Sequence, residues 1–142
     1  MGCDIHVHTE VKINGRWEHL GNPAIERNYD LFALLADVRN YNEVKPIAKP
    51  RGVPDDATYL TKWDCEKWSG DAHNHSFINA YEVIYLEAFI KKQYEQNSFY
   101  SMCPVEKEFG WIFGNTWAGF NEYPEDRPDG LEDIRIIFWF DN

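Results

Sequence analysis

The chain has 142 residues, of which 24 are acidic and 14 basic, so its formal net charge is -10. This length fits one domain over residues 1–142, and a content of 44% hydrophobic and 16% aromatic residues predicts a packed globule, not a disordered chain. The acidic charge argues against non-specific binding to nucleic acid, because phosphate backbones repel it.

The chain opens on a predicted β-hairpin. Residues 3–13 alternate between apolar and polar side chains, which is the pattern of a half-buried strand. The polar face carries Asp4, His6, His8, Glu10 and Lys12. Asn14-Gly15 then supplies the residues that a type I′ turn needs. We expect a second strand to return over residues 16–20.

A short helix and a long loop are expected next. The helix should begin at Tyr29 or Asp30, with Asp30 as a possible cap, and should end near Val38. From Arg39 to Tyr59 the chain contains three prolines and a glycine. A loop of that length inside a compact domain is often functional.

The strongest helix prediction covers residues 80–96. Asn79 and Glu82 have the spacing of a capping box, with Asn in place of Ser or Thr. Helical periodicity predicts a buried stripe. Its members are Tyr81, Ile84, Tyr85, Ala88 and Phe89.

The last predicted element is a strand over residues 134–140. Its side chains are apolar on both faces apart from Arg135, which is typical of a central strand. We expect it to pair with the first strand. The sequence therefore predicts an α+β fold, in which the N-terminal β-hairpin and the C-terminal strand form a mainly antiparallel sheet packed against one long and one short helix.

The chain has three cysteines, Cys3, Cys65 and Cys103. Their odd number and wide spacing argue against a disulfide framework. We expect reduced, mostly buried thiols. No secretory signal and no run of about 18 apolar residues is visible, so the expected location is the cytoplasm and no membrane partner is expected.

Two segments share the pattern Asp-x-His-x-His followed by a hydroxyl residue. They are Asp4 to Thr9 and Asp71 to Ser76. On a strand, residues two apart point the same way and lie about 6.6 Å apart along the axis. Two imidazoles at that spacing can converge on one ion about 2.0–2.1 Å from each nitrogen. We therefore predict a divalent-metal site whose ligands are His6, His8, His73 and His75.

The carboxylates of the same two segments are the predicted catalytic groups. Asp4 and Asp71 would each act as a ligand, as an orienting partner of an imidazole, or as a general base. Nitrogen and carboxylate ligands together favour zinc, manganese, iron or nickel over calcium or magnesium, and we expect zinc or manganese. A structural interpretation also stands, since histidine and aspartate suit the polar face of a hairpin and a solvated loop.

The long loop concentrates positive charge. Arg39, Lys49 and Arg51 could clamp a phosphate beside the metal, as guanidinium forks do. Asp55, or its neighbour Asp56, would then be a further ligand or a base. The alternative is that residues 51–56 form a rigid turn with a helix cap and bind nothing.

The opening Met1 to His6 resembles that of a group of small bacteriophage and prophage proteins. The likeness continues in residues 29–33, 37–40, 51–56 and 71–76, and covers about two thirds of the chain. It implies a viral setting and a host cell as the place of action.

Three functions follow from these patterns. The first is a metal-dependent hydrolase that acts on a phosphodiester or a nucleotide, such as a host defence signal. The second is a protein that sequesters a small phosphorylated ligand or nucleotide without turnover. The third is an acidic inhibitor that binds a basic site on a host protein.

Overall fold

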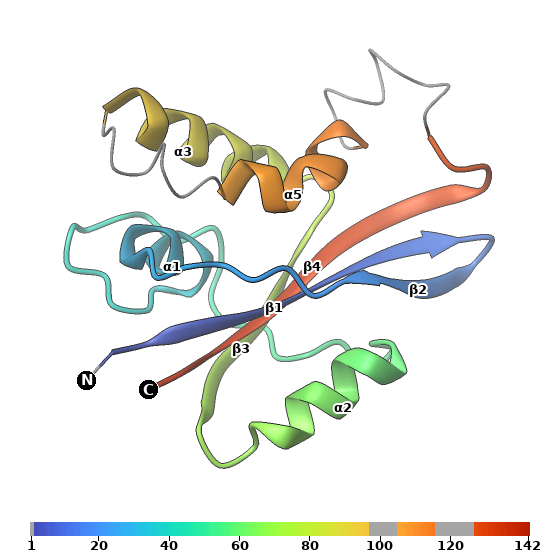
Figure 1. The fold of residues 1–142 in the computed structure, drawn as a ribbon, viewed down its shortest axis with the longest axis horizontal. Helices are drawn as coiled ribbons and strands as arrows, with labels where there is room; N and C mark the ends of the chain where they lie inside the picture. Colours follow the sequence, from blue (N-terminus) through green and yellow to red (C-terminus); the bar gives the residue numbers. More distant parts are fainter. Residues whose placement is uncertain (1, 97–104, 116–126) are drawn as a thin grey trace.

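The computed structural model describes residues 2–96, 105–115 and 127–142, which form one four-stranded antiparallel sheet with helices on both faces (Figure 1). The strand order is β2-β1-β4-β3. The strands are β1 (Asp4–Ile13), β2 (Arg16–Gly21), β3 (Ala72–Asn79) and β4 (Leu131–Asp141). The helices are α1 (Tyr29–Ala36), α2 (Tyr59–Lys67), α3 (Val83–Gln96) and α5 (Val105–Gly114). The predicted α+β class is confirmed.

The N-terminal hairpin of β1 and β2 is confirmed. Asn14 and Gly15 have φ angles of 49° and 80°, which are the left-handed conformations that a type I′ turn requires. The turn sets the register, so Glu10 lies opposite His19. β2 is an edge strand of the sheet.

β4 lies at the centre of the sheet, between β1 and β3, as the sequence predicted. It pairs with β1 along nearly the whole length of both strands, with Asp4 opposite Asp141 and His6 opposite Trp139. Both faces of β4 are buried from Ile134 to Phe140. This explains why its sequence does not alternate.

The helix caps agree with the sequence in part. The predicted reciprocal bonds of the capping box are present, because Glu82 N–H donates to Asn79 Oδ1 and Asn79 N–H donates to Glu82 Oε1. α3 nevertheless begins at Val83, three residues later than predicted. The predicted cap Asp30 lies inside α1, and Asn28 caps that helix by accepting a hydrogen bond from Leu31 N–H.

The predicted buried stripe of α3 was wrong except at Phe89, which is partly buried and packs against the core. The buried residues of α3 are Val83, Leu86, Glu87 and Ile90. Tyr81 is 87% exposed and Tyr85 is 61% exposed. Apolar side chains lie around most of this helix, so periodicity alone does not determine which side meets the sheet.

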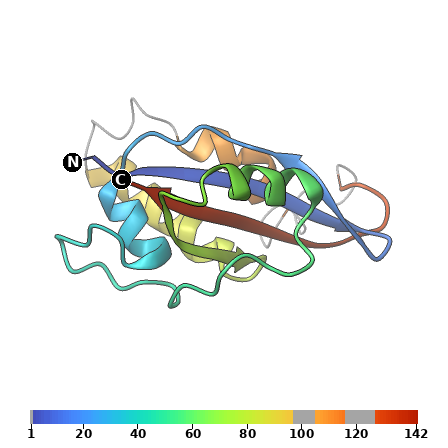
Figure 2. The same cartoon turned by 90° about the horizontal axis from the view of Figure 1, so that it is seen from below.

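The helices form two layers. α1, α3 and α5 cover one face of the sheet, and α2 covers the other (Figure 1). Seen from below, α2 lies across β1 and β4 (Figure 2). The main apolar core fills the space between the sheet and the first layer. The sequence predicted two helices, α1 and α3, and did not predict α2 or α5.

Two further sequence predictions concern thiols and membranes. Cys3 is buried and Cys65 is partly buried, and both are free thiols whose pKa is raised mainly by burial. Cys103 lies outside the described residues. Within the described part of the chain, no helix has the length and apolarity needed to span a membrane.

Candidate functional site

Histidines gather on the face of the sheet that α2 covers. We call this the histidine face, and its members are His6, His8, His19 and His75. The indole of Trp139 on β4 lies among them. The ring centroids of His6, His8 and His75 are 6.1, 5.3 and 5.9 Å from that of Trp139. β1, β2 and β3 therefore each contribute imidazoles to one face.

His73 does not join this face. The register of β3 against β4 shifts between His73 and Ser76, and Asn74 has a φ of 54°. His73 lies opposite Phe140, a residue of the main apolar core, and residues directly opposite each other share a face. The structure thus brings three of the four predicted ligands to one side of the sheet and places His73 on the other.

His6 forms a dyad with a carboxylate from the end of β4. Its Nε2 lies 2.5 Å from Oδ2 of Asp141. The His6 ring also lies against Trp68, which follows α2, at 4.2 Å between centroids. A carboxylate that accepts from Nε2–H leaves the lone pair on Nδ1, so the contact fixes the tautomer of His6.

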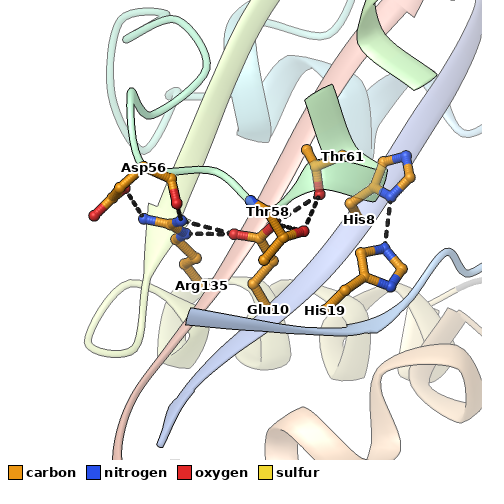
Figure 3. Close-up of polar contacts among 7 residues, drawn as sticks. All are labelled: His8, Glu10, His19, Asp56, Thr58, Thr61 and Arg135. Atoms are coloured by element: carbon orange, nitrogen blue, oxygen red, sulfur yellow. Dashed lines mark hydrogen bonds and ion pairs between the residues drawn. The ribbon is translucent and has the colours of Figure 1, made fainter. Parts of the chain in front are cut away.

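His8 is the middle residue of a hydrogen-bonded chain. Its Nε2 lies 2.7 Å from Oδ2 of Asp64 on α2. Its Nδ1 lies 2.9 Å from Nε2 of His19 on β2 (Figure 3). His8 is only 2% exposed. Burial, and then the neighbouring His8, lowers the pKa of His19, so the neutral imidazole of His19 is favoured.

Glu10 is the anchor of α2 and not a free ligand. Its Oε1 accepts from Nε and Nη2 of Arg135, and its Oε2 accepts from the backbone and hydroxyl of Thr58 and the hydroxyl of Thr61 (Figure 3). Burial acts to raise the pKa of Glu10, but these hydrogen bonds outweigh it and lower the pKa. A buried carboxylate with this many donors holds the start of α2 to the sheet.

The predicted catalytic carboxylates lie elsewhere. Asp4 pairs with Arg27 at 2.6 Å on the surface, and the hydrogen bond from Arg27 lowers the pKa of Asp4. Asp71 and Asp55 are both exposed. In the part of the chain that the structure describes, the carboxylates that contact histidines are Asp64 and Asp141.

The predicted phosphate clamp is not assembled at the histidine face. Arg51 makes a two-armed ion pair with Glu82, with both bonds at 2.6 Å. The guanidinium of Arg39 lies over the ring of Tyr29 and donates to the hydroxyl of Tyr41. Lys49 lines a separate hollow of about 450 Å³ near the end of α1. The rigid-turn interpretation of the loop therefore fits Arg51.

The predicted four-histidine metal centre is not assembled as a set. Across residues 2–96, 105–115 and 127–142, no three side chains of His, Cys, Asp or Glu are grouped so that they could hold a metal ion. The described residues form instead a pair, His6 with Asp141, and a hydrogen-bonded chain of Asp64, His8 and His19.

Sequence reasoning missed three residues of this site: His19, Asp141 and Asp64. The hairpin register could have found His19, because a two-residue turn at Asn14-Gly15 places it opposite Glu10. The pairing of β1 with β4 places Asp141 beside the start of β1. Nothing in the sequence indicates Asp64, because its contact with His8 depends on how α2 docks.

Comparisons with protein-family models, with curated proteins and with solved structures found no match for this chain. The functional argument therefore depends on the geometry of the histidine face.

Proposed function

We propose that the protein is a hydrolase of phosphoester bonds in small molecules such as nucleotides, with His6 as its general acid–base group. One observation carries the proposal: on one face of β1, two imidazoles two residues apart each have Nε2 against a carboxylate, His6 with Asp141 and His8 with Asp64. Imidazoles oriented by carboxylates are the usual proton-transfer groups of hydrolases.

The tautomer of His6 defines the proposed chemistry. With Nε2–H donated to Asp141, the Nδ1 lone pair can accept a proton from a water molecule as its oxygen bonds to phosphorus. The bond between phosphorus and the leaving oxygen breaks, and the same imidazole returns the proton to that oxygen. Asp141 holds the ring in place and stabilises its charged form.

The proposed reaction needs positive charge beside the phosphoryl group, and we take a metal ion as its source. Arg39, Lys49 and Arg51 have other positions or partners, so they do not supply positive charge beside His6. A divalent cation, with zinc or manganese as the candidates from the sequence, would supply it as a Lewis acid. The net charge of -10 raises the local concentration of such cations.

Trp68 gives the proposed substrate an aromatic neighbour. Its ring packs at 4.2 Å from His6 and its side chain is partly exposed. Indole rings stack on the faces of nucleobases. A nucleotide whose base contacts Trp68 would bring its phosphate close to His6.

Hydrolysis assays test the proposal. Bis-p-nitrophenyl phosphate and a panel of cyclic and linear nucleotides would be incubated with the full chain, with and without Zn²⁺ or Mn²⁺. We expect His6→Ala to lower kcat/KM by about 10²–10⁴-fold. His73→Ala is the matched control, because it removes the same side chain from the other face of the sheet, and it should leave kcat/KM unchanged.

Two results would reject the proposal: no turnover of any substrate in the panel, or full activity in a folded His6→Ala variant. Circular dichroism and thermal unfolding of both variants separate a loss of chemistry from a loss of structure, since His6 also packs on Trp68.

Ligand sequestration without turnover is a second candidate. The observation that favours it is that the His6 ring contacts two indoles, with centroid distances of 4.2 Å to Trp68 and 6.1 Å to Trp139. Such a site can bind an aromatic ligand by stacking alone. Calorimetry followed by recovery of intact nucleotide would favour sequestration, whereas recovery of the cleaved product would favour hydrolysis.

A further inference from the structure

We infer that His8 and His19 are the two protein ligands of a divalent transition-metal ion, bound between Nδ1 of His8 and Nε2 of His19, with Asp64 orienting His8 from behind. The catalytic use of this ion rests on the proposed function, but its binding can be measured without turnover.

The distance between the two nitrogens is close to that of a ligand pair. They lie 2.9 Å apart. Two nitrogens that each bind zinc at about 2.0–2.1 Å in a tetrahedral site are about 3.3 Å apart. The difference is a few tenths of an ångström. The ion would replace the direct contact between the two rings, so the His19 ring would move off the axis of the present hydrogen bond. β2, which carries His19, is an edge strand with one neighbour.

Asp64 provides the second element of a metal site. Its carboxylate lies 2.7 Å from Nε2 of His8, so the proton of the neutral imidazole is on Nε2 and the lone pair on Nδ1 faces His19. Metal-binding histidines almost always donate their other N–H to a carboxylate, a carbonyl or water in this way. The contact therefore prepares His8 for binding a cation.

The other candidate ligands are excluded by position or by partners. His73 is on the opposite face of the sheet, and His75 lies on β3, beyond β4 from β1. Glu10 already accepts hydrogen bonds from Arg135, Thr58 and Thr61. Of the described residues, two imidazoles would thus hold the ion. Oxygen atoms of water or substrate would fill its remaining positions, where the ion could act as a Lewis acid.

The chemistry of the two ligands defines the ions to be tested. Imidazole nitrogen suits zinc, cobalt, nickel and copper, whereas magnesium and calcium prefer oxygen ligands. The full chain, prepared without a histidine tag and stripped of metal, would be titrated with Zn²⁺ by calorimetry and with Co²⁺ by visible absorption. We expect one equivalent of either ion to bind, and Mg²⁺ not to compete.

The variants separate this pair from the other histidines. His19→Ala should weaken Zn²⁺ binding at least about 10-fold, and Asp64→Asn should weaken it by about 10–100-fold. His73→Ala and His6→Ala should bind as the wild type does. Long-range ¹H–¹⁵N spectra of the imidazoles should show Zn²⁺ at Nδ1 of His8 and at Nε2 of His19.

His19→Ala is the primary test because His8 is buried and its replacement can prevent folding, whereas His19 lies on an edge strand. The inference is overturned if the wild type binds neither ion, or if a folded His19→Ala binds Zn²⁺ as tightly as the wild type. Binding without hydrolysis would reject only the proposed function. Hydrolysis that survives both chelation and His19→Ala would reject only the catalytic use of the ion.

Discussion

The two Asp-x-His-x-His segments have the same pattern of residues but different structures. The first lies in β1, a strand with neighbours on both sides, and its two histidines point to one face. The second begins β3, an edge strand, where the irregularity at Asn74 sends His73 and His75 to opposite faces. A spacing of two residues therefore predicts a shared direction only where the strand stays regular.

Each segment is also held by an arginine–glutamate pair, and the pairs differ in burial. Near the first segment, Arg135 binds Glu10, and the side chains are 7% and 0% exposed. Near the second, Arg51 binds Glu82, and the side chains are 30% and 15% exposed. The first segment should therefore depend more strongly on its ion pair than the second.

Breaking the buried pair should have the largest effect. Arg135→Ala leaves the carboxylate of Glu10 buried without its cation, and we expect the free energy of unfolding to fall by about 3–5 kcal/mol. Urea unfolding monitored by tryptophan fluorescence measures it. Asp56→Ala is the control, because Asp56 also binds Arg135 but its side chain is 66% exposed, so that loss should be about 0–1 kcal/mol. Equal losses in the two variants would contradict the anchoring role of Glu10.

The irregularity of β3 can be tested at Asn74. Asn74→Val places a β-branched residue at a φ of 54°, and we expect a destabilisation of about 1–3 kcal/mol. Asn74→Gly adopts this conformation without strain, and its stability should change by less than about 1 kcal/mol in either direction. Thermal unfolding compares the two. If valine were tolerated as well as glycine, the left-handed residue would not be what separates His73 from His75.

The partly exposed pair of Arg51 and Glu82 should have the smallest effect on the free energy of unfolding. Its contribution should be visible in the pH dependence of stability. Burial acts to raise the pKa of Glu82, but the hydrogen bonds from Arg51 and Asn79 outweigh it, so the pKa in the folded state lies below the ordinary value of 4.5. The ionised carboxylate thus stabilises the fold above about pH 4.5. This contribution is lost as the pH falls through the lowered pKa of the folded state.

Glu82→Gln tests whether the ionised carboxylate stabilises the fold and loses its effect on acidification. At pH 7 we expect it to reduce the free energy of unfolding by about 1 kcal/mol, in line with a partly exposed, hydrogen-bonded pair. The difference from the wild type should shrink as the pH is lowered from 5 towards 3, measured by urea unfolding at each pH. A difference that stays constant or grows on acidification would show that the charge of Glu82 does not contribute.

The sequence by itself determined the local parts of this protein. Alternation in residues 3–13 and the Asn14-Gly15 turn define the hairpin and the polar face that carries His6 and His8. The run from Ile134 to Phe140 defines a central strand. Asn79 and Glu82 define a helix start to within three residues. These features depend on backbone preferences over a few neighbouring residues.

Only the tertiary structure decided which groups the histidines meet. Asp64 reaches His8 across 56 positions of sequence, and Asp141 reaches His6 across 135. Both contacts depend on how α2 and β4 dock on β1, and docking follows from the burial of many apolar side chains at once. The direction of His73 also depends on the tertiary structure. It lies on an edge strand, and a strand with one neighbour can contain a residue that leaves the regular hydrogen-bonded ladder.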